Sequence, residues 1–142
     1  MCIILASLDR SSIPTRKELE YACAYNPDGF GYGMVLMNCA TGETTIHTAR
    51  QMDSGKAITG YLADLRAAES QGLEILAWAF HARIATHGSI RLDNCHPFPV
   101  PHDNAVMFHN GVLDVSQAKT DDRTDSQAFA EDYLPAIGGV PY

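Results

Sequence analysis

The segment LEILAWAFHA at residues 73–82 is an apolar run with aromatic and branched side chains. Its length and composition predict a buried central strand. Shorter apolar runs at residues 2–8 and 30–37 predict two further strands. Residues 44–48 are expected to pair with 30–37 as a hairpin across a short glycine-containing turn.

Helix signals lie between and after these strands. Residues 15–24 begin with the capping-box pattern Thr-Arg-Lys-Glu and carry an apolar stripe. Asp53 or Ser54 can cap a second helix, which Gly72 is expected to end. A second capping box opens a helix expected over residues 124–137. The chain therefore alternates helices and strands irregularly, as α+β domains do.

The segment between the central strand and the last helix is rich in loop residues. Residues 85–103 contain many Gly, Pro, His and Asn residues and predict a long loop, of the kind that often carries function. Residues 105–108 predict a short strand, followed by Asn110-Gly111, a strong turn signal. No linker or internal repeat interrupts the sequence, so residues 1–142 are expected to form one domain.

Composition narrows the function. The chain has 142 residues, 46% hydrophobic residues, 19% charged residues and a net charge of −7. These values are typical of one globular domain, and an acidic chain without a Lys/Arg cluster is a poor candidate for binding nucleic acid. No apolar run is long enough to cross a membrane, and the N-terminus has no signal-peptide pattern, so we expect a cytoplasmic protein.

Cys2 is the first candidate catalytic residue. It is one of four cysteines, none of them in a Cys-x-x-Cys pair, so reduced thiols are expected. Removal of Met1 is favoured when the next side chain is small, and it would leave Cys2 with a thiol and a free α-amine. An α-amine titrates near neutral pH and can take the thiol proton. By position alone, Cys2 is more simply a strand residue.

Polar groups at the ends of the predicted strands supply further candidates. Arg83 follows the central strand, and its planar fork suits a carboxylate, although pairing with an acidic residue is the plainer interpretation. Asn110 and Gly111 can form an oxyanion hole or a plain turn. Asp125 at a helix start can bind an ammonium group or simply complement the helix dipole.

Together these segments resemble the class II glutamine amidotransferase domain of the N-terminal nucleophile hydrolase superfamily, most closely compact phage and bacterial proteins of this type. The resemblance spans nearly the whole chain. It rests on six segments in family order: MC at 1–2, NPDGFGYG at 26–33, HARIATHG at 81–88, NCHPF at 94–98, FHNG at 108–111 and TDSQAF at 124–129.

The resemblance implies that Cys2 is the nucleophile that attacks the side-chain amide of glutamine. It implies that Asn110 and Gly111 form the oxyanion hole. Ammonia would leave, and water would hydrolyse the glutamyl thioester. No cofactor and no metal ion is expected.

The resemblance also implies a substrate-binding set. Arg83 would bind the α-carboxylate of glutamine, with main-chain groups near Thr86 and His87 assisting. Asp125 would hold the α-ammonium group. The chain contains no domain to use the ammonia, so the acceptor would belong to a separate chain, or the protein would act as a glutaminase.

The implied fold is a four-layer α-β-β-α sandwich of antiparallel sheets. Three departures stand against the family pattern. Ile3 replaces a glycine, Tyr25-Asn26 replaces Arg-Gly, and the strands that usually complete the second sheet are missing. A fragment, a degenerate copy and a minimal form completed by self-association all remain open.

Three alternative functions remain open as well. The chain could hydrolyse a different amide, or serve as a catalytically silent binding or assembly module. It could also bind a metal ion, although no spacing matches a familiar zinc site. The candidate metal ligands are His81, His87, Cys95, His96, His102 and His109.

Overall fold

The computed structural model describes the whole chain except residues 10–11, 87, 116–121 and 141–142. Its main sheet is antiparallel, with the strand order β1-β4-β2-β3, and β4 is central as predicted. The strands are β1 (Ile3–Ser7), β2 (Phe30–Asn38), β3 (Thr44–Gln51) and β4 (Leu73–Ala82). The β2–β3 hairpin pairs as expected, and β3 extends three residues beyond the predicted Thr48.

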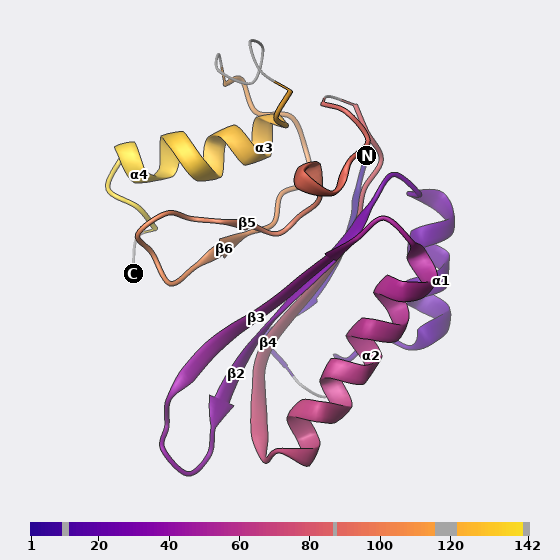
Figure 1. Cartoon of the computed structure of the whole chain (residues 1–142), viewed down its shortest axis with the longest axis vertical. Coiled ribbons are helices and arrows are strands. Elements are labelled where there is room, and N and C mark those ends of the chain that lie inside the picture. The colour runs from indigo at the N-terminus through magenta and orange to yellow at the C-terminus, as the bar shows by residue number, and fades with distance from the viewer. Residues whose placement is uncertain (10–11, 87, 116–121, 141–142) are drawn as a thin grey trace.

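Helices α1 (Arg16–Tyr25) and α2 (Ser54–Ser70) cover one face of this sheet (Figure 1). Thr15 caps α1 through the predicted capping box, in which Glu18 N donates to Thr15 Oγ1 and Thr15 N donates to Glu18 Oε2. Asp53 rather than Ser54 caps α2, since its Oδ1 accepts from Lys56 N at 2.7 Å.

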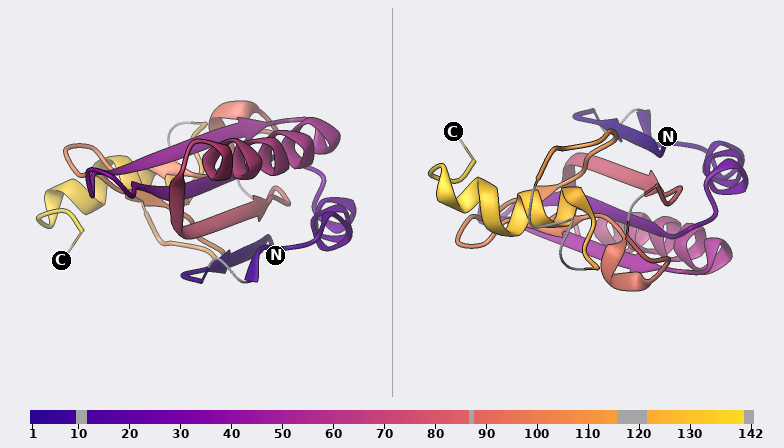
Figure 2. Two further views of the ribbon diagram at one scale, coloured as in Figure 1. Left: turned by 90° about the horizontal axis from the view of Figure 1, so that it is seen from below. Right: turned by 90° about the horizontal axis from the view of Figure 1, so that it is seen from above.

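The second layer lies on the opposite face of the sheet (Figures 1 and 2). In it, β5 (Phe98–Pro99) pairs antiparallel with β6 (Val106–Met107). The final helical region comprises α3 (Asp125–Ala128), the π-helical turn η4 (Phe129–Tyr133) and α4 (Leu134–Ala136). The described residues thus form an α+β fold with antiparallel sheets and helices on both outer sides.

Three details of this layer differ from the sequence predictions. The loop expected over 85–103 contains a 3-10 turn, η2 (Leu92–Asn94), and the strand β5. The last helix is not regular, because its middle turn widens into a π-helix. Asn110-Gly111 follows β6 without joining it to another strand within the described part of the chain, since tertiary contacts rather than hairpin pairing place it.

The two faces of the sheet are packed differently. Leu19, Tyr61 and Phe80 are completely buried in the core between the sheet and the helices. On the other face, Gly31 allows the second layer to approach the backbone closely. A Cβ at Gly31 would lie 1.8 Å from the carbonyl oxygen of His96, so only glycine fits there.

Candidate functional site

The candidate site lies where the start of β1 meets the end of β4. Ile3 pairs with Ala82, which places Cys2 beside the residues that follow β4. The Cys2 thiol lies 3.6 Å from the carbonyl oxygen of Ile84, and the residue is only partly buried. The sheet register therefore explains how the chain start reaches the segment containing Arg83.

Asn110 joins this position from the second layer. Its Nδ2 donates to the main-chain carbonyl of Cys2 at 2.9 Å, across 108 residues of sequence. An asparagine amide carries two N–H donors, so this bond leaves one for another acceptor. Gly111 follows with φ 156°, and a Cβ there would lie 3.1 Å from His109 Nε2. The structure thus brings Cys2, Asn110 and Gly111 together.

Arg83 is 3% exposed, and both its main chain and its guanidinium group are hydrogen-bonded. Its main-chain N–H donates to Gly29 at 2.8 Å, and its carbonyl accepts from Asp28 at 2.9 Å. Its guanidinium donates to the carbonyl of Ser89 at 3.1 Å. These bonds hold the buried, permanently charged guanidinium group of Arg83 in place just after the end of β4.

Asp125 opens α3 directly after the helix cap Thr124. Its Oδ2 accepts from Leu113 N at 2.6 Å, and its Oδ1 accepts from Ser126 N at 2.8 Å. The carboxylate therefore also anchors the loop that follows Asn110. Because a carboxylate has about four acceptor positions, these two bonds are compatible with a further donor.

A hydroxyl links the same helix to the oxyanion candidates. Ser126 Oγ lies 3.0 Å from His109 Nδ1 and 3.4 Å from Asp125 Oδ1. His109 immediately precedes Asn110, so the start of α3 is hydrogen-bonded to the segment that contacts Cys2. Sequence reasoning did not assign Ser126 this role.

Two buried histidines lie between the layers. The rings of His81 and His96 are in contact, with centroids 4.1 Å apart and planes tilted by 33°. Burial lowers the pKa of His81 to about 4. The His109 main chain acts in the opposite direction and raises this pKa, while the Arg83 charge lowers it further. Burial and the neighbouring His81 lower the pKa of His96 to about 2. Both rings are therefore neutral at pH 7.

Asn26 contacts the chain start from another direction. Its Nδ2 donates to the Met1 carbonyl at 2.7 Å, while Met1 itself is 90% exposed. Tyr25, the residue before Asn26, is exposed. An exposed Met1 is accessible to an aminopeptidase, and its removal would break this hydrogen bond.

The remaining predicted residues are less defined. Thr86 is exposed in the loop after β4, and His87 lies outside the described residues. Within the described ranges, no three His, Cys, Asp or Glu side chains are grouped to hold a metal ion. No helix in the same ranges is both long and apolar enough to cross a membrane.

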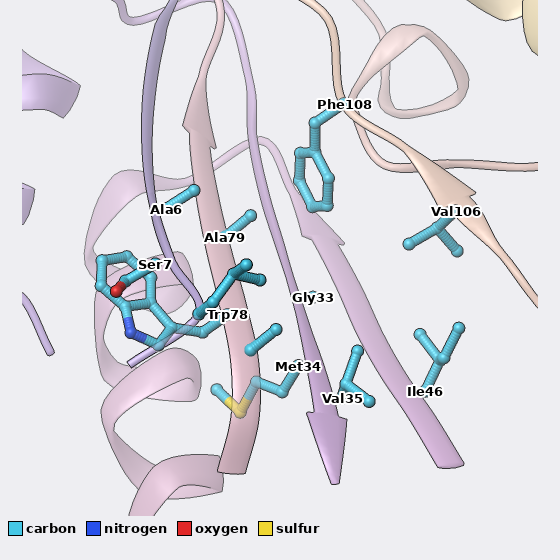
Figure 3. A pocket seen from close by; sticks show the side chains of 12 residues that line it. Ala6, Ser7, Gly33, Met34, Val35, Ile46, Trp78, Ala79, Val106 and Phe108 are labelled. Carbon is cyan, nitrogen blue, oxygen red and sulfur yellow. The ribbon is translucent and has the colours of Figure 1, made fainter. Parts of the chain in front are cut away.

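An apolar hollow of about 390 Å³ lies farther along the inner face (Figure 3). Val106 and Phe108 of the second layer face Ala6 and Ala79 of the main sheet across it. Ala6 is four residues from Cys2, or about 13 Å along an extended strand. None of the candidate site residues that the structure describes is among the residues that line this hollow.

Several contacts at the site carry no strong sequence signal. Asn94 and Asp122 connect the loop after Arg83 to the segment before Asp125. Asn94 belongs to the NCHPF segment, but nothing in its local sequence shows that it is completely buried. Buried asparagines become recognisable only when their hydrogen-bond partners are known.

A scan against protein-family models finds no match to this chain, and a search of curated protein sequences finds no significant match.

Proposed function

We propose that this protein hydrolyses the side-chain amide of glutamine, using Cys2 as an N-terminal nucleophile. The observation that carries the proposal is the hydrogen bond from Asn110 to the Cys2 carbonyl. It brings a candidate oxyanion donor to the main chain of the residue that carries the thiol, across 108 residues of sequence. The order of the layers is compatible with the N-terminal nucleophile hydrolase fold, to which we assign residues 1–142 as one domain.

The proposed reaction needs Met1 to be removed. The freed α-amine of Cys2 takes the thiol proton, and the thiolate attacks the amide carbon of glutamine. The second N–H of Asn110 and the main-chain N–H of Gly111 stabilise the oxyanion. The C–N bond breaks, the proton passes to the leaving nitrogen, and ammonia departs. Water then cleaves the thioester, giving glutamate and restoring the thiol.

The substrate-binding half of the proposal concerns Arg83 and Asp125. Arg83 is a buried cation suited to the α-carboxylate, and Asp125 is an anion suited to the α-ammonium group. Main-chain groups near Thr86 and His87 would complete the set. A site that pairs both charges favours an amino acid over a simple amide.

The proposed thiol chemistry suits a reducing compartment such as the cytoplasm. It requires no cofactor and no metal ion. A separate acceptor chain would use the ammonia, or the protein would release it as a glutaminase. Self-association is one way to complete the short second sheet.

The direct test compares ammonia and glutamate release by the wild type and Cys2→Ala. We expect stoichiometric products from the wild type and at least a thousandfold loss in Cys2→Ala, because the nucleophile is removed. Cys23→Ala is the matched control. Burial raises the pKa of the Cys23 thiol to about 11, so that thiol is not a nucleophile at pH 7. Equal background release from wild type and Cys2→Ala would refute the proposal.

A catalytically silent assembly module is the second candidate. It is favoured by the contact between Asn26 and the Met1 carbonyl, which exists only while Met1 is retained. Intact-mass measurement separates the two candidates. A retained Met1 would leave Cys2 without an amine base and would favour the silent module.

A further inference from the structure

Two segments of the candidate site meet around one buried side chain. Asn94 ends the turn η2 and has no exposed surface. Its Nδ2 donates to the carbonyls of Ser89 and Asp122, both at 3.0 Å. Ser89 and Asp122 are 33 residues apart in the sequence. One amide group therefore joins the loop after β4 to the segment before α3.

Each of these carbonyls leads to one proposed substrate-binding residue. The Ser89 carbonyl also accepts from Arg83 Nη1 at 3.1 Å, so Asn94 and the guanidinium share an acceptor. Asp122 lies three residues before Asp125, with the helix cap Thr124 between them. Asn94 is thus linked to Arg83 through the shared Ser89 carbonyl. It is linked through the Asp122 carbonyl to the segment that leads to Asp125.

Packing leaves this amide little room to move. Gly88 has φ 71°, and a Cβ there would lie 3.0 Å from Asn94 Nδ2 and 3.3 Å from Thr124 Cγ2. The three residues are therefore in close contact, with the asparagine between the two segments. The two carbonyl acceptors also fix the orientation of the Asn94 amide. If the amide were flipped, its own oxygen would face both carbonyl oxygens and be repelled by them.

We propose that Asn94 is a positioning residue that sets the separation of Arg83 and Asp125, so that both bind one amino-acid head group together. This inference rests on the proposed function. Asn94 acts through the Ser89 and Asp122 carbonyls and does not itself touch the substrate. A rigid spacing matters because a small displacement of either charge weakens a two-point contact.

An exposed connection between the same segments provides an internal comparison. The Asp122 carboxylate accepts from Ser89 Oγ at 2.9 Å and pairs with Arg91 at 3.0 Å. The Asp122 side chain is 56% exposed, so solvent weakens these contacts. Replacing Asp122 by Asn should therefore affect head-group binding less than replacing Asn94.

The experiment measures two properties in the full chain. The first is the KM and kcat for ammonia release from L-glutamine. The second is the rate at which iodoacetamide alkylates Cys2, followed by peptide mass spectrometry, and the protection that L-glutamate gives. Iodoacetamide lacks an amino-acid head group, so its rate reports on the thiol alone.

For Asn94→Ala we expect about a tenfold rise in KM and in the L-glutamate concentration for half-protection, with kcat within about threefold of wild type. The alkylation rate without L-glutamate should stay within about twofold. Asn38→Ala is the control, because the exposed Asn38 side chain, at the end of β2, accepts hydrogen bonds from the nearby main-chain N–H groups of Ala40 and Thr41. It should leave all four values unchanged.

Equal KM and equal protection in Asn94→Ala and wild type would overturn the positioning role. So would a parallel loss of kcat and alkylation rate, which marks general damage to the fold. If Asn94→Ala does not fold, Asn94→Ser retains one donor and should shift KM in the same direction by less. A Ser variant identical to wild type would also overturn it.

Failure of the proposed function would look different. A wild type that releases no ammonia, yet is protected by L-glutamate in an Asn94-dependent way, would refute hydrolysis and support the positioning role. A wild type that neither releases ammonia nor is protected would overturn both.

Discussion

Asn110 shows how single hydrogen bonds assemble the candidate site. Its amide reaches the main chain of Cys2, while the neighbouring His109 bonds to Ser126 at the start of α3. Asp125 then accepts from Leu113, two residues beyond Gly111. The proposed nucleophile, oxyanion donors and ammonium-binding residue are thus parts of one hydrogen-bonded unit.

Asp125→Asn tests the proposed ammonium contact. Asparagine keeps an oxygen for Leu113 N but loses the negative charge. We expect KM for glutamine to rise about tenfold or more, since a hydrogen bond to a charged group is worth about 1.5–3 kcal/mol. Asp103→Asn is the matched control, because Asp103 accepts from Val140 N away from the site. An unchanged KM in Asp125→Asn would contradict the assigned role.

His81 should make the protein acid-sensitive. Burial lowers its folded-state pKa to about 4, below the usual value of 6.5, so the unfolded chain binds the proton more readily. The free energy of unfolding is therefore highest above pH 6.5 and falls as the pH drops toward 4. The slope from this residue reaches about 1.4 kcal/mol per pH unit.

Urea denaturation from pH 7 to pH 4 measures this effect. In His81→Leu we expect the free energy of unfolding to depend less steeply on pH, by up to about 1.4 kcal/mol per pH unit, which corresponds to one proton. Phe98→Leu perturbs the same interlayer packing without removing a titrating group, since the Phe98 ring contacts the His96 ring with centroids 4.5 Å apart. It should keep the wild-type slope. An unaltered slope in His81→Leu would show that His81 is not the group responsible.

At the scale of elements, the contact between β2 and the second layer depends on glycine. Gly31→Ala would place a methyl group against the His96 carbonyl, which belongs to backbone and cannot rotate away. We expect destabilisation of more than about 3 kcal/mol, at or above the usual range for overpacking. Thermal or urea denaturation measures it.

Gly42→Ala is the control for this substitution. Gly42 has φ 73° but nothing lies within 4 Å of its added Cβ, so only backbone strain of about 1 kcal/mol is expected. If both variants lose equal stability, the close approach of the two layers is not the reason for glycine at position 31.

Elements with strong local signals were predicted well. The capping box at Thr15 and the apolar run of β4 lie where the sequence places them, and the cap of α2 is Asp53, one of the two residues predicted for it. Local hydrogen bonding and side-chain periodicity determine such features. The π-helical turn Phe129–Tyr133 carries no such signal, because tertiary packing rather than propensity widens a helix.

The site was predictable only in part for the same reason. Cys2, Arg83, Asn110 and Asp125 were proposed from their motifs, and the hydrogen bond between Asn110 and the Cys2 carbonyl joins two of them. The bridge made by Asn94 depends on carbonyls 33 residues apart. Every residue has a main-chain carbonyl, so the residue types at positions 89 and 122 do not indicate which carbonyls Asn94 contacts. The sequence alone therefore could not predict this bridge.

At the scale of the whole molecule, the two layers differ in how they are stabilised. The main core joins α1 and α2 to the sheet through a large cluster of buried apolar side chains, whereas the second layer has the short ladder β5–β6 and, among the described residues, fewer buried apolar side chains, such as Phe98 and Ala128. We expect amides of β2 and β4 to exchange only through global unfolding, and those of β5 and β6 through a smaller local opening.

Hydrogen exchange followed by mass spectrometry measures this difference. Peptides covering β5 and β6 should exchange at least about tenfold faster than those covering β4. Equal protection in both layers would show that the second layer unfolds together with the core. Slower exchange of β5 and β6 after addition of L-glutamate would indicate that the ligand stabilises the second layer.

The central claim is that Cys2, freed of Met1, attacks the amide carbon of glutamine. The most direct measurement is the intact mass of the protein after incubation with an electrophilic diazoketone analogue of glutamine. The account predicts a chain lacking Met1 and carrying one label on Cys2, with no label in Cys2→Ala. A chain that retains Met1 and takes up no label, or a label that persists in Cys2→Ala, would contradict it.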